Sequence, residues 1–229
     1  MYDLVIGDRS YSSWSLRGWL LLDAFGLPVT TRSARLYTDE LPRLLKDYHP
    51  ARTAPALRLP DGTVVMESLA VAEELASRDP EAGHWPADPR ARAVARSLAA
   101  EMHAGFQALR GQCPMNLRVS YRETPVDEAL RADLDRLEVI WDWARGTVGA
   151  DGPWLCGAYG AVDAFFAPVA SRIATYDLPV SDRAMAYVEA HLAHPSFLRW
   201  RAEGLSEGAD QEFYRRPFPT RPWPGPEPR

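Results

Sequence analysis

Residues 2–31 read YDLVIGDRSYSSWSLRGWLLLDAFGLPVTT, and their pattern is the strongest indication of the fold. Residues 2–7 form a short apolar run that suits a buried strand. Residues 14–25 carry apolar side chains at the spacing of one helical face, and the Gly-Leu-Pro that follows is typical of a helix end. The β-branched Val-Thr-Thr at 29–31 suits a second strand. The stretch therefore predicts a strand, a helix and a strand in succession.

The segments that follow extend this unit. We expect a helix at 41–48, and two short strands at 56–59 and 63–66 flank the turn sequence PDG, which predicts a hairpin. Residues 67–78 are strong helix formers with their apolar positions close to one face. The predicted order is β-α-β-α-β-β-α, an α/β fold for residues 1–79.

A second unit follows a linker. Residues 80–89 contain three prolines and one glycine, which is typical of a connection between domains. We expect residues 90–214 to be an all-α helical domain, because their periodic segments contain no alternating strand pattern. Those segments are 91–112, 126–145, 162–175 and 183–193. Residues 215–229 form a proline-rich tail that we expect to be extended, either loose or packed through Trp223.

Composition and charge exclude several classes of protein. The 46% hydrophobic and 25% charged content is ordinary for a folded chain of 229 residues. A formal net charge of −5 disfavours binding to nucleic acid or to anionic lipid, because both need a concentrated positive surface. No apolar run approaches the ~20 residues that cross a membrane, and the first residues lack a signal pattern. We expect a cytoplasmic protein with no nucleic-acid and no membrane partner.

The cysteines and histidines predict no metal site and no disulfide scaffold. Cys113 and Cys156 are the only cysteines, and their spacing is not that of a zinc site. His191 and His194 precede Pro195 at an expected helix end, where helix capping or a solvent-facing position is the interpretation we prefer to metal binding.

The turn between the first strand and the first helix offers the first candidate site. Residues 8–17 read DRSYSSWSLR and place five hydroxyls at a helix N-terminus. One serine suffices to cap the helix. The alternative is activation of a ligand thiol: a free thiol ionises near pH ~8.5, and hydroxyl hydrogen bonds and the helix dipole both stabilise the thiolate.

Two further segments could hold an extended peptide. Pro55 directly precedes a predicted strand, where it could cap the strand or carry a cis bond that turns the backbone of Ala54 towards the serine-rich turn. Glu67 and Ser68 begin a predicted helix, where backbone N–H groups and the Ser68 hydroxyl suit a carboxylate and Glu67 suits an ammonium group. Taken separately, Ser68 reads as a cap and Glu67 as a favourable first-turn charge.

Together these segments resemble a known family. SYSSWSLRGWLLL, HPARTAPAL and VVMESLAVAEEL, in this order, are similar to the N-terminal domain of cytosolic glutathione transferases, closest to bacterial and zeta-like members. LCGAYGAVDAFFAPVASR is similar to the motif that opens the central helix of the family's second domain. The resemblance implies a thioredoxin-like N-terminal domain, an all-helical C-terminal domain, glutathione as substrate or cofactor, and a homodimer.

The resemblance also implies roles for residues on the glutathione side. Ala54 before Pro55 corresponds to the residue that pairs with the cysteine backbone of glutathione, and Glu67-Ser68 corresponds to the pair that holds its γ-glutamyl end. Arg52 and Thr53 stand where family members bind the glycine carboxylate, and their charge suits that end.

The catalytic hydroxyl has three candidates. Counting back from Arg17 against zeta enzymes gives Ser10, whereas the YSSWSLR core shared with bacterial relatives indicates Ser12 or Ser13. A hydroxyl next to the helix N-terminus is better placed to stabilise a thiolate, so we rank Ser12 first, then Ser13, then Ser10. The turn contains no cysteine, which disfavours thiol–disulfide exchange.

The second-domain motif departs from the family at one position. Gly160 stands where the family usually has a serine or threonine cap, three residues before Asp163. Glycine costs only about a few tenths of a kcal/mol at this position, and we interpret Asp163 as structural.

The second substrate has its own candidate residues. His103, Phe106 and Arg110 lie three and four apart, so that one helical face would present them to a cleft together, and Arg118 follows. The alternative is that Phe106 belongs to the core, His103 to an interface and Arg110 to an ion pair. Exposed arginines here would favour an anionic or carbonyl-bearing co-substrate.

Three functions therefore remain open. The first is a glutathione transferase that activates the thiol by a serine hydroxyl for attack on a small electrophile. The second is a zeta-like glutathione-dependent cis–trans isomerase of the maleylacetoacetate type. The third is a glutathione-binding or protein-interaction module without turnover.

Overall fold

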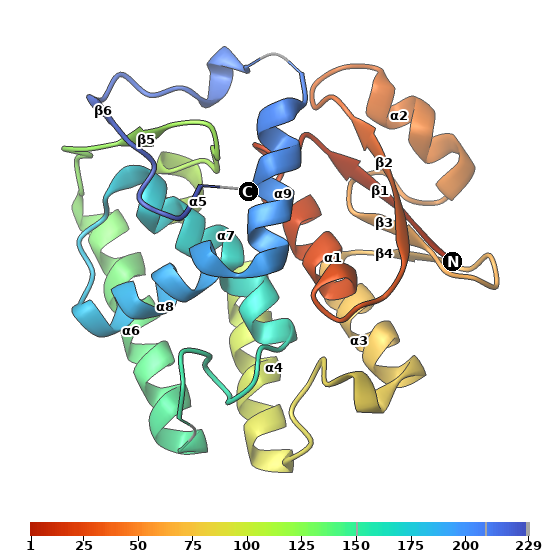
Figure 1. The fold of residues 1–229 in the computed structure, drawn as a ribbon, viewed down its shortest axis with the longest axis horizontal. Coiled ribbons are helices and arrows are strands. Elements are labelled where there is room, and N and C mark those ends of the chain that lie inside the picture. The colour runs from red at the N-terminus through yellow and green to blue at the C-terminus, as the bar shows by residue number, and fades with distance from the viewer. Residues whose placement is uncertain (150, 209, 228–229) are drawn as a thin grey trace.

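The structure is a computed structural model that describes residues 1–149, 151–208 and 210–227, and it consists of an α/β part and a helical part (Figure 1). The α/β part follows the predicted order. Its elements are β1 (Tyr2–Gly7), α1 (Ser13–Asp23), β2 (Val29–Ala34), α2 (Glu40–Leu45) with the 3-10 helix Lys46–Tyr48, β3 (Ala56–Arg58), β4 (Val64–Met66) and α3 (Ser68–Arg78).

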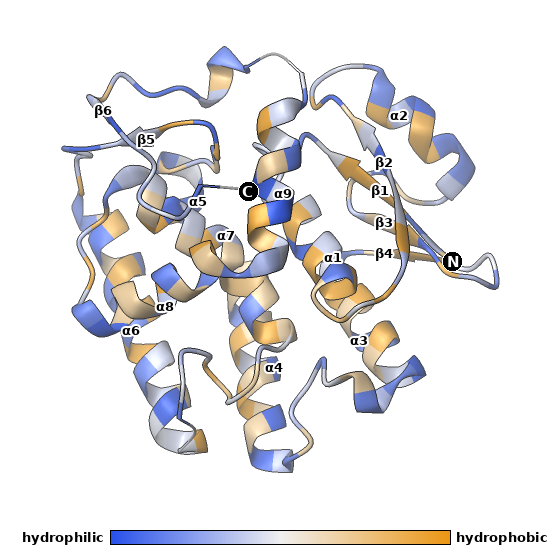
Figure 2. Cartoon of the chain, in the orientation of Figure 1, coloured by the Kyte–Doolittle hydropathy of each residue, from blue (hydrophilic) through white to orange (hydrophobic). Residues whose placement is uncertain are grey.

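The sheet is mixed and has helices on both faces. Its strand order is β2-β1-β3-β4, with β1 parallel to β2 and antiparallel to β3. Leu4 and Ile6 point into the main core, whereas Val5 points into a smaller core on the α2 side with Tyr48 and Ala56. Because β1 is buried on both faces, its run is apolar throughout instead of alternating. Figure 2 shows the apolar colouring of β1 and of α1.

A glycine brings α1 against the loop before β3. A Cβ atom at Gly18 would lie 2.7 Å from Pro55 Cβ and 2.8 Å from its Cγ, so only glycine allows this approach. The Ala54–Pro55 peptide bond is cis. The residue that the sequence singled out before β3 therefore packs directly on the helix that follows the serine-rich turn.

The helical part is built around α7. Its elements are α4 (Pro89–Ala104), α5 (Gln107–Gln112), α6 (Glu128–Val148), α7 (Ala161–Tyr176), α8 (Asp182–Ala193) and α9 (Pro195–Ser206). All 16 residues of α7 are buried, and the helix contacts α1, α4 and α8 (Figure 1). The long segment 79–88 joins α3 to α4 and includes the 3-10 helix Pro80–Ala82. Across the described ranges, none of the helices is both long and apolar enough to span a bilayer.

The N-terminus of α7 is held by a buried carboxylate. Asp163 Oδ2 accepts a hydrogen bond of 2.9 Å from Gly160 N, and Oδ1 accepts one of 2.7 Å from Tyr187 Oη. Burial raises the pKa of Asp163 to about 6. A Cβ atom at Gly160 would lie 3.3 Å from the carbonyl oxygen of His84, which leaves little room for the usual cap. These contacts agree with a structural role for Asp163.

Three features of the helical part differ from expectation. The predicted helix 91–112 is broken between α4 and α5, because Gly105 ends α4 and Phe106 adopts a left-handed conformation with φ of 59°. The domain is not purely helical: β5 (Ser120–Tyr121) pairs with β6 (Thr220–Arg221) of the tail. The tail is otherwise extended, with Trp223 packed against the core; its residues 228–229 lie outside the described part.

The third difference is α9, which the sequence analysis did not include. Pro195 ends α8 but also begins α9 as its first residue, a position that proline favours. His194 Nδ1 caps the new helix by accepting from Ser196 N at 3.2 Å, so the capping role was right for this residue. His191 is instead buried, at 1% exposure, and burial lowers its pKa to about 3.

Candidate functional site

A cavity of about 900 Å³ lies between the α/β part and the helical part. The α/β part contributes the serine-rich turn, the segment before β3 and Glu67. The helical part contributes α5 and its neighbours, and residues 213–216, which follow α9, close a third side. The lining residues are Tyr11, Ser12, Ser13, Trp14, Leu36, Tyr37, Leu41, Thr53, Ala54, Pro55, Glu67, His103, Gln107, Arg110, Gly111, Pro114, Met115, Arg172, Phe213, Tyr214 and Arg216.

Ser12 and Ser13 both line the cavity at the N-terminus of α1 but differ in their hydrogen bonds. Ser12 is the N-cap: its Oγ accepts from Ser15 N at 3.3 Å and donates to Ser15 Oγ at 2.7 Å. Ser13 Oγ accepts from Nη2 of the buried Arg172 at 3.3 Å. The Ser13 proton has no acceptor among the described residues, so it remains free to be donated to a ligand.

Ser10 points away from the cavity. Its Oγ donates to the carbonyl of Gly204 at 2.9 Å, and a Cβ atom at Gly204 would lie 3.1 Å from that oxygen. The end of α9 therefore sits directly on Ser10 and occupies its hydroxyl. Sequence counting could not reveal this, because α9 comes almost 200 residues later. As the third candidate for the catalytic hydroxyl, Ser10 is excluded from the cavity by this contact.

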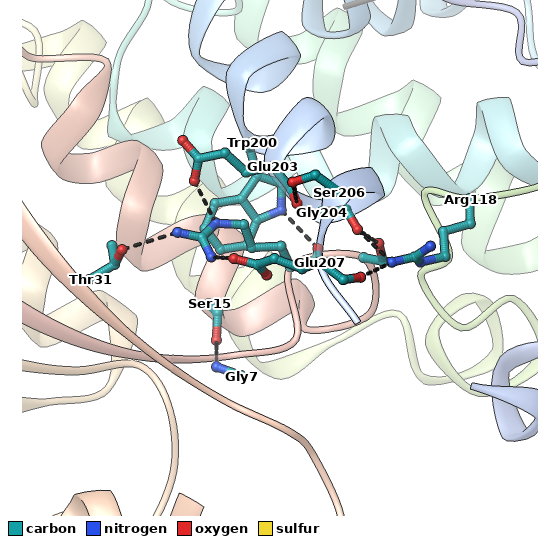
Figure 3. A network of polar contacts seen from close by, with 11 residues as sticks. Gly7, Ser15, Thr31, Arg118, Trp200, Glu203, Gly204, Ser206 and Glu207 are labelled. Atoms are coloured by element: carbon teal, nitrogen blue, oxygen red, sulfur yellow. Dashed lines mark hydrogen bonds and ion pairs between the residues drawn. The ribbon is translucent and has the colours of Figure 1, made fainter. Parts of the chain in front are cut away.

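A polar network fixes the start of the serine-rich turn to α9 (Figure 3). Arg9, which is 6% exposed, lies 2.8 Å from Glu203, pairs with Glu207 and donates to Thr31 at 3.0 Å. Trp200 Nε1 donates to the Arg9 carbonyl at 2.9 Å. At the other end of the turn, Gly7 N donates to Ser15 Oγ at 2.9 Å. Both ends of the turn are thus anchored, which holds Ser12 and Ser13 in place.

Aromatic residues of the turn and of the segment after α9 form one wall. The Tyr11 hydroxyl pairs with Asp210 and accepts from Gln211 N at 3.0 Å, and burial raises the pKa of Tyr11 to about 12. The Tyr11 ring stacks on Tyr214, with 4.6 Å between centroids. Because its hydroxyl is engaged and its pKa is raised, Tyr11 is a wall residue and a poor source of thiol activation.

The expected peptide-binding residues of the α/β part separate into two groups. Thr53, Ala54 and Pro55 line the cavity, whereas Arg52 is exposed and lies outside the lining. The segment before β3 thus reaches the cavity from the same part of the fold as the serines.

Glu67 and Ser68 also differ from each other. Glu67 lines the cavity and has φ of 66°, an unusual conformation for a residue with a side chain. Ser68 is the first residue of α3 and is fully buried; its Oγ has no hydrogen-bond partner in the described structure. An orphaned hydroxyl beside a helix N-terminus suits an anionic ligand group.

The second-substrate residues only partly follow the prediction. His103 and Arg110 line the cavity, and burial, with Arg17 nearby, lowers the pKa of His103. Phe106 does not line it: the break between α4 and α5 turns its side chain into the core, where it is 6% exposed. The three residues therefore do not share one continuous helical face.

Arg118 also lies outside the lining, contrary to expectation. Its Nη2 donates to the carbonyl of Gly204 at 2.8 Å and to the carbonyl of Glu207 (Figure 3). These carbonyl groups stand at the C-terminal end of α9, where helix carbonyls lack partners within the helix and a cation is favourable. Arg118 acts as a helix cap here.

A family model matches the segment that carries the serine-rich turn. Residues 11–78 match the family described as "Glutathione S-transferase, N-terminal domain". This segment of the chain is similar to the N-terminal domain of glutathione S-transferases. The matched range holds every α/β residue that lines the cavity, from Tyr11 to Glu67.

One curated relative is similar to part of this chain. It is a "Probable maleylacetoacetate isomerase" from Caenorhabditis elegans, with 34% identity over 101 residues. The match covers 44% of this chain and 46% of the relative, so the chain spans about half the length of the curated relative it matches.

Solved glutathione transferases share the whole fold. A homolog from Burkholderia gl BGR1 with bound glutathione superposes with a TM-score of 0.68 at 23% identity, covering 90% of this chain and 99% of that one. A homolog from sulfitobacter, also with bound glutathione, gives 0.63 at 20% identity over 90% and 99%. Omega 3C from Trametes versicolor gives 0.66 at 21% identity over 93% and 91%. At these identities the likeness establishes the fold.

Sequence reasoning missed three residues of the site. Trp14 lines the cavity directly after Ser13, and Arg172 reaches Ser13 from α7. Arg17, 1% exposed, lies behind them with its guanidinium 4.6 Å from the Trp14 ring centroid. The sequence does contain a sign of Arg17 and Arg172, because each stands among mostly hydrophobic residues of a predicted helix. A buried charge is costly, so an arginine in such a place suggests a functional role.

Proposed function

We propose that this chain is a glutathione transferase in which the Ser13 hydroxyl activates the glutathione thiol for attack on a small electrophile. The observation that carries the proposal is the hydrogen bond from Arg172 to Ser13 Oγ. It occupies the acceptor side of the hydroxyl and leaves the proton to be donated to a thiolate. The ranking of Ser12 over Ser13 is reversed in this proposal, because the Ser12 proton is donated to Ser15.

Other residues support a tripeptide site. The free backbone of Thr53 and Ala54 beside the cavity suits pairing with the glutathione backbone as an added strand. The unpartnered Ser68 hydroxyl and the N-terminus of α3 suit the γ-glutamyl carboxylate, and Glu67 suits its ammonium group. In this assignment Arg52 attracts the glycine carboxylate from outside the cavity lining.

The chemical step uses the thiolate as nucleophile. The thiol loses its proton to solvent, and the Ser13 hydroxyl and the α1 N-terminus stabilise the negative sulfur. The sulfur electron pair then forms a bond to the electrophilic carbon, and a leaving group departs with the electrons of its bond. The cavity wall from α5 and the tail holds the electrophile against the sulfur.

A second candidate is a zeta-like cis–trans isomerase of the maleylacetoacetate type. The similarity to the relative from Caenorhabditis elegans and the arginines of the cavity favour it. Here the thiolate adds to a conjugated double bond, rotation follows, and elimination regenerates glutathione. A third candidate is a glutathione-binding or protein-interaction module without turnover.

Substitution of single serines tests the activation mechanism. We expect Ser13→Ala to raise the pKa of the bound glutathione thiol by about 1 to 2 units, because a hydrogen bond to a charged group contributes about 1.5–3 kcal/mol. Ser12→Ala should change the thiol pKa less and should mainly lower stability, through loss of the α1 cap. The thiol pKa is measured by the ultraviolet absorbance of the thiolate in the complex.

Two controls sharpen this test. Binding of S-methylglutathione should be retained by Ser13→Ala, because that ligand has no thiol to activate. The activation mechanism is wrong if Ser13→Ala leaves both the thiol pKa and the turnover of electrophiles and maleyl-type substrates unchanged. Turnover of maleyl-type substrates without conjugation would favour the isomerase candidate.

We also propose a homodimer in the cytoplasm, with domains at 1–79 and 90–214. Val139 and Trp143, at 58% and 49% exposure, border a shallow cleft between α4 and α6, and such exposed apolar side chains suit burial against a second copy. Light scattering after size-exclusion chromatography should give about twice the mass of one chain. A mass of one chain would contradict the proposal.

A further inference from the structure

Three arginines lie beside Ser13 and Trp14 at the cavity. Arg17 lies in α1, Arg110 in α5 and Arg172 in α7. The guanidinium carbons of Arg17 and Arg110 are 4.6 Å and 4.7 Å from the Trp14 ring centroid. Arg172 binds the neighbouring Ser13. Three helices far apart in the sequence therefore bring positive charge to the same side of the cavity.

None of these three charges is paired with a carboxylate in the described ranges 1–149, 151–208 and 210–227. The Arg17 Nε and Nη1 atoms are buried without any hydrogen-bond partner. Arg172 donates to the carbonyls of Cys113 and Pro168 and to Ser13 Oγ. Arg110 makes only two long contacts, from Nη1 to carbonyls at 3.3 Å and 3.4 Å.

The cavity itself supplies little negative charge. Glu67 is the single acidic side chain in its described lining, and it lies 3.9 Å from His103. Arg216 of the tail adds a further cation to the lining. The wall around Trp14 is thus strongly positive in a protein whose net charge is −5.

The three arginines also disfavour one another. Burial lowers the pKa of Arg17 well below its usual range, with Arg172 and Arg110 adding to the effect. Burial and Arg110 lower the pKa of Arg172 to about 10, and burial lowers that of Arg110. An arrangement that costs free energy in the empty protein is relieved by a bound anion.

We propose that this cluster is an anion subsite for a carboxylate on the second substrate, held directly by Arg110 with Arg17 and Arg172 behind it. The inference rests on the proposed function and names the substrate class: a small electrophile that carries a carboxylate. Arg110 is the direct ligand because it lines the cavity, is partly exposed, and has Nε and Nη2 groups without an acceptor in the described structure.

The position of the cluster distinguishes the co-substrate from glutathione itself. The residues suited to the two glutathione carboxylates, Arg52 and Ser68, belong to the α/β part. Arg110 belongs to the helical part, on the other side of Ser13 and Trp14. An electrophile bound through its carboxylate at Arg110 would therefore have its reactive carbon towards a sulfur held at Ser13.

Product analogues that differ only in charge test the subsite. S-(carboxymethyl)glutathione and S-(carbamoylmethyl)glutathione have nearly the same shape, but only the first carries the extra carboxylate. The same comparison is made with the carboxyethyl and carbamoylethyl pair, in which the carboxylate or amide lies one methylene group farther from the sulfur. Affinities are measured by calorimetry for the wild type, Arg110→Gln and the control Arg90→Gln, together with S-methylglutathione as the reference ligand.

Arg90 is a matched control because its loss changes the net charge equally. It is an exposed residue of α4 outside the cavity lining. In the wild type and in Arg90→Gln we expect at least one carboxylate analogue to bind about tenfold or more tightly than its amide, as a charge-assisted pair allows. In Arg110→Gln this ratio should fall to near one, while S-methylglutathione still binds.

Two results would overturn the proposal, and they are distinguishable. If S-methylglutathione binds but neither carboxylate analogue is preferred over its amide, the anion subsite is wrong and the tripeptide site stands. If none of the glutathione derivatives binds, the proposed function fails and the subsite fails with it. A preference that survives Arg110→Gln unchanged would also reject the assignment to this cluster.

Discussion

Replacement of Gly18 by alanine should disturb the packing of α1 against Pro55, which lines the cavity. The added Cβ would lie 2.7 Å from Pro55 Cβ and 2.8 Å from Cγ, and both are atoms of a rigid ring that cannot rotate away. Overpacking of this kind costs about 1–3 kcal/mol, whereas the helix propensity of alanine returns about 1 kcal/mol. The net loss of unfolding free energy is then about 0–2 kcal/mol.

The same substitution at Gly146 is the matched control. Gly146 is an exposed residue of α6, and a Cβ atom there would meet nothing within 4 Å. Gly146→Ala should therefore gain about 1 kcal/mol. The two variants should differ by about 1–3 kcal/mol, which corresponds to about 2–12 °C in Tm for a chain of this size.

Differential scanning calorimetry and glutathione titration read out the two effects. Because Pro55 lines the cavity, Gly18→Ala should also weaken glutathione binding, whereas Gly146→Ala should leave it unchanged. If Gly18→Ala is as stable as Gly146→Ala and binds glutathione like the wild type, the close packing of α1 on Pro55 does not set the site.

Two further predictions concern the buried charges. Burial raises the pKa of the Asp163 carboxyl from 3.8 to about 6, so the folded protein keeps this proton at pH values where the unfolded chain has lost it. The resulting stabilisation of the folded state is fully present below pH 3.8 and is lost as the pH rises to about 6. The difference in unfolding free energy between the wild type and Asp163→Asn should therefore fall by roughly 3 kcal/mol between pH 3.8 and about pH 6. A difference that does not change with pH would contradict this prediction. Arg9→Met should lower the unfolding free energy by about 1–3 kcal/mol in urea, because it removes every polar contact of a buried guanidinium to α9 and β2. Glu203→Gln, at a half-exposed partner, should cost less than about 1 kcal/mol; equal losses would show that burial of Arg9 is not what matters.

The α/β part could be predicted closely because its signals are local. The apolar run of β1, the hairpin around β3 and β4 and the helix after Glu67 each have a distinct pattern within a few residues. The helical part was harder. Proline is common both just after the end of a helix and at its first position, so Pro195 in the sequence does not indicate whether a new helix follows. The structure shows that α9 begins there.

The site could be predicted only where its residues are adjacent in sequence. Ser12, Ser13 and the segment before β3 were found because each forms a short motif. The choice between the serines depends on partners more than 150 residues away: Arg172 reaches Ser13, and Gly204 binds Ser10. A single sequence does not encode such contacts in any local pattern.

The break between α4 and α5 likewise could not be predicted from the residues expected to bind the second substrate. Helical spacing predicted one face for His103, Phe106 and Arg110, but Gly105 interrupts the helix and Phe106 enters the core. His103 and Arg110 still reach the cavity, each from its own helix. Two of the three predicted positions thus line the cavity, although they do not share the predicted helical face.

Calorimetric titration of the purified protein with reduced glutathione tests whether the cavity is a tripeptide site. It is repeated with S-methylglutathione, which separates recognition of the peptide from recognition of the thiol. We predict saturable binding of both ligands at one per chain. If neither ligand binds up to millimolar concentration, the cavity is not a glutathione site.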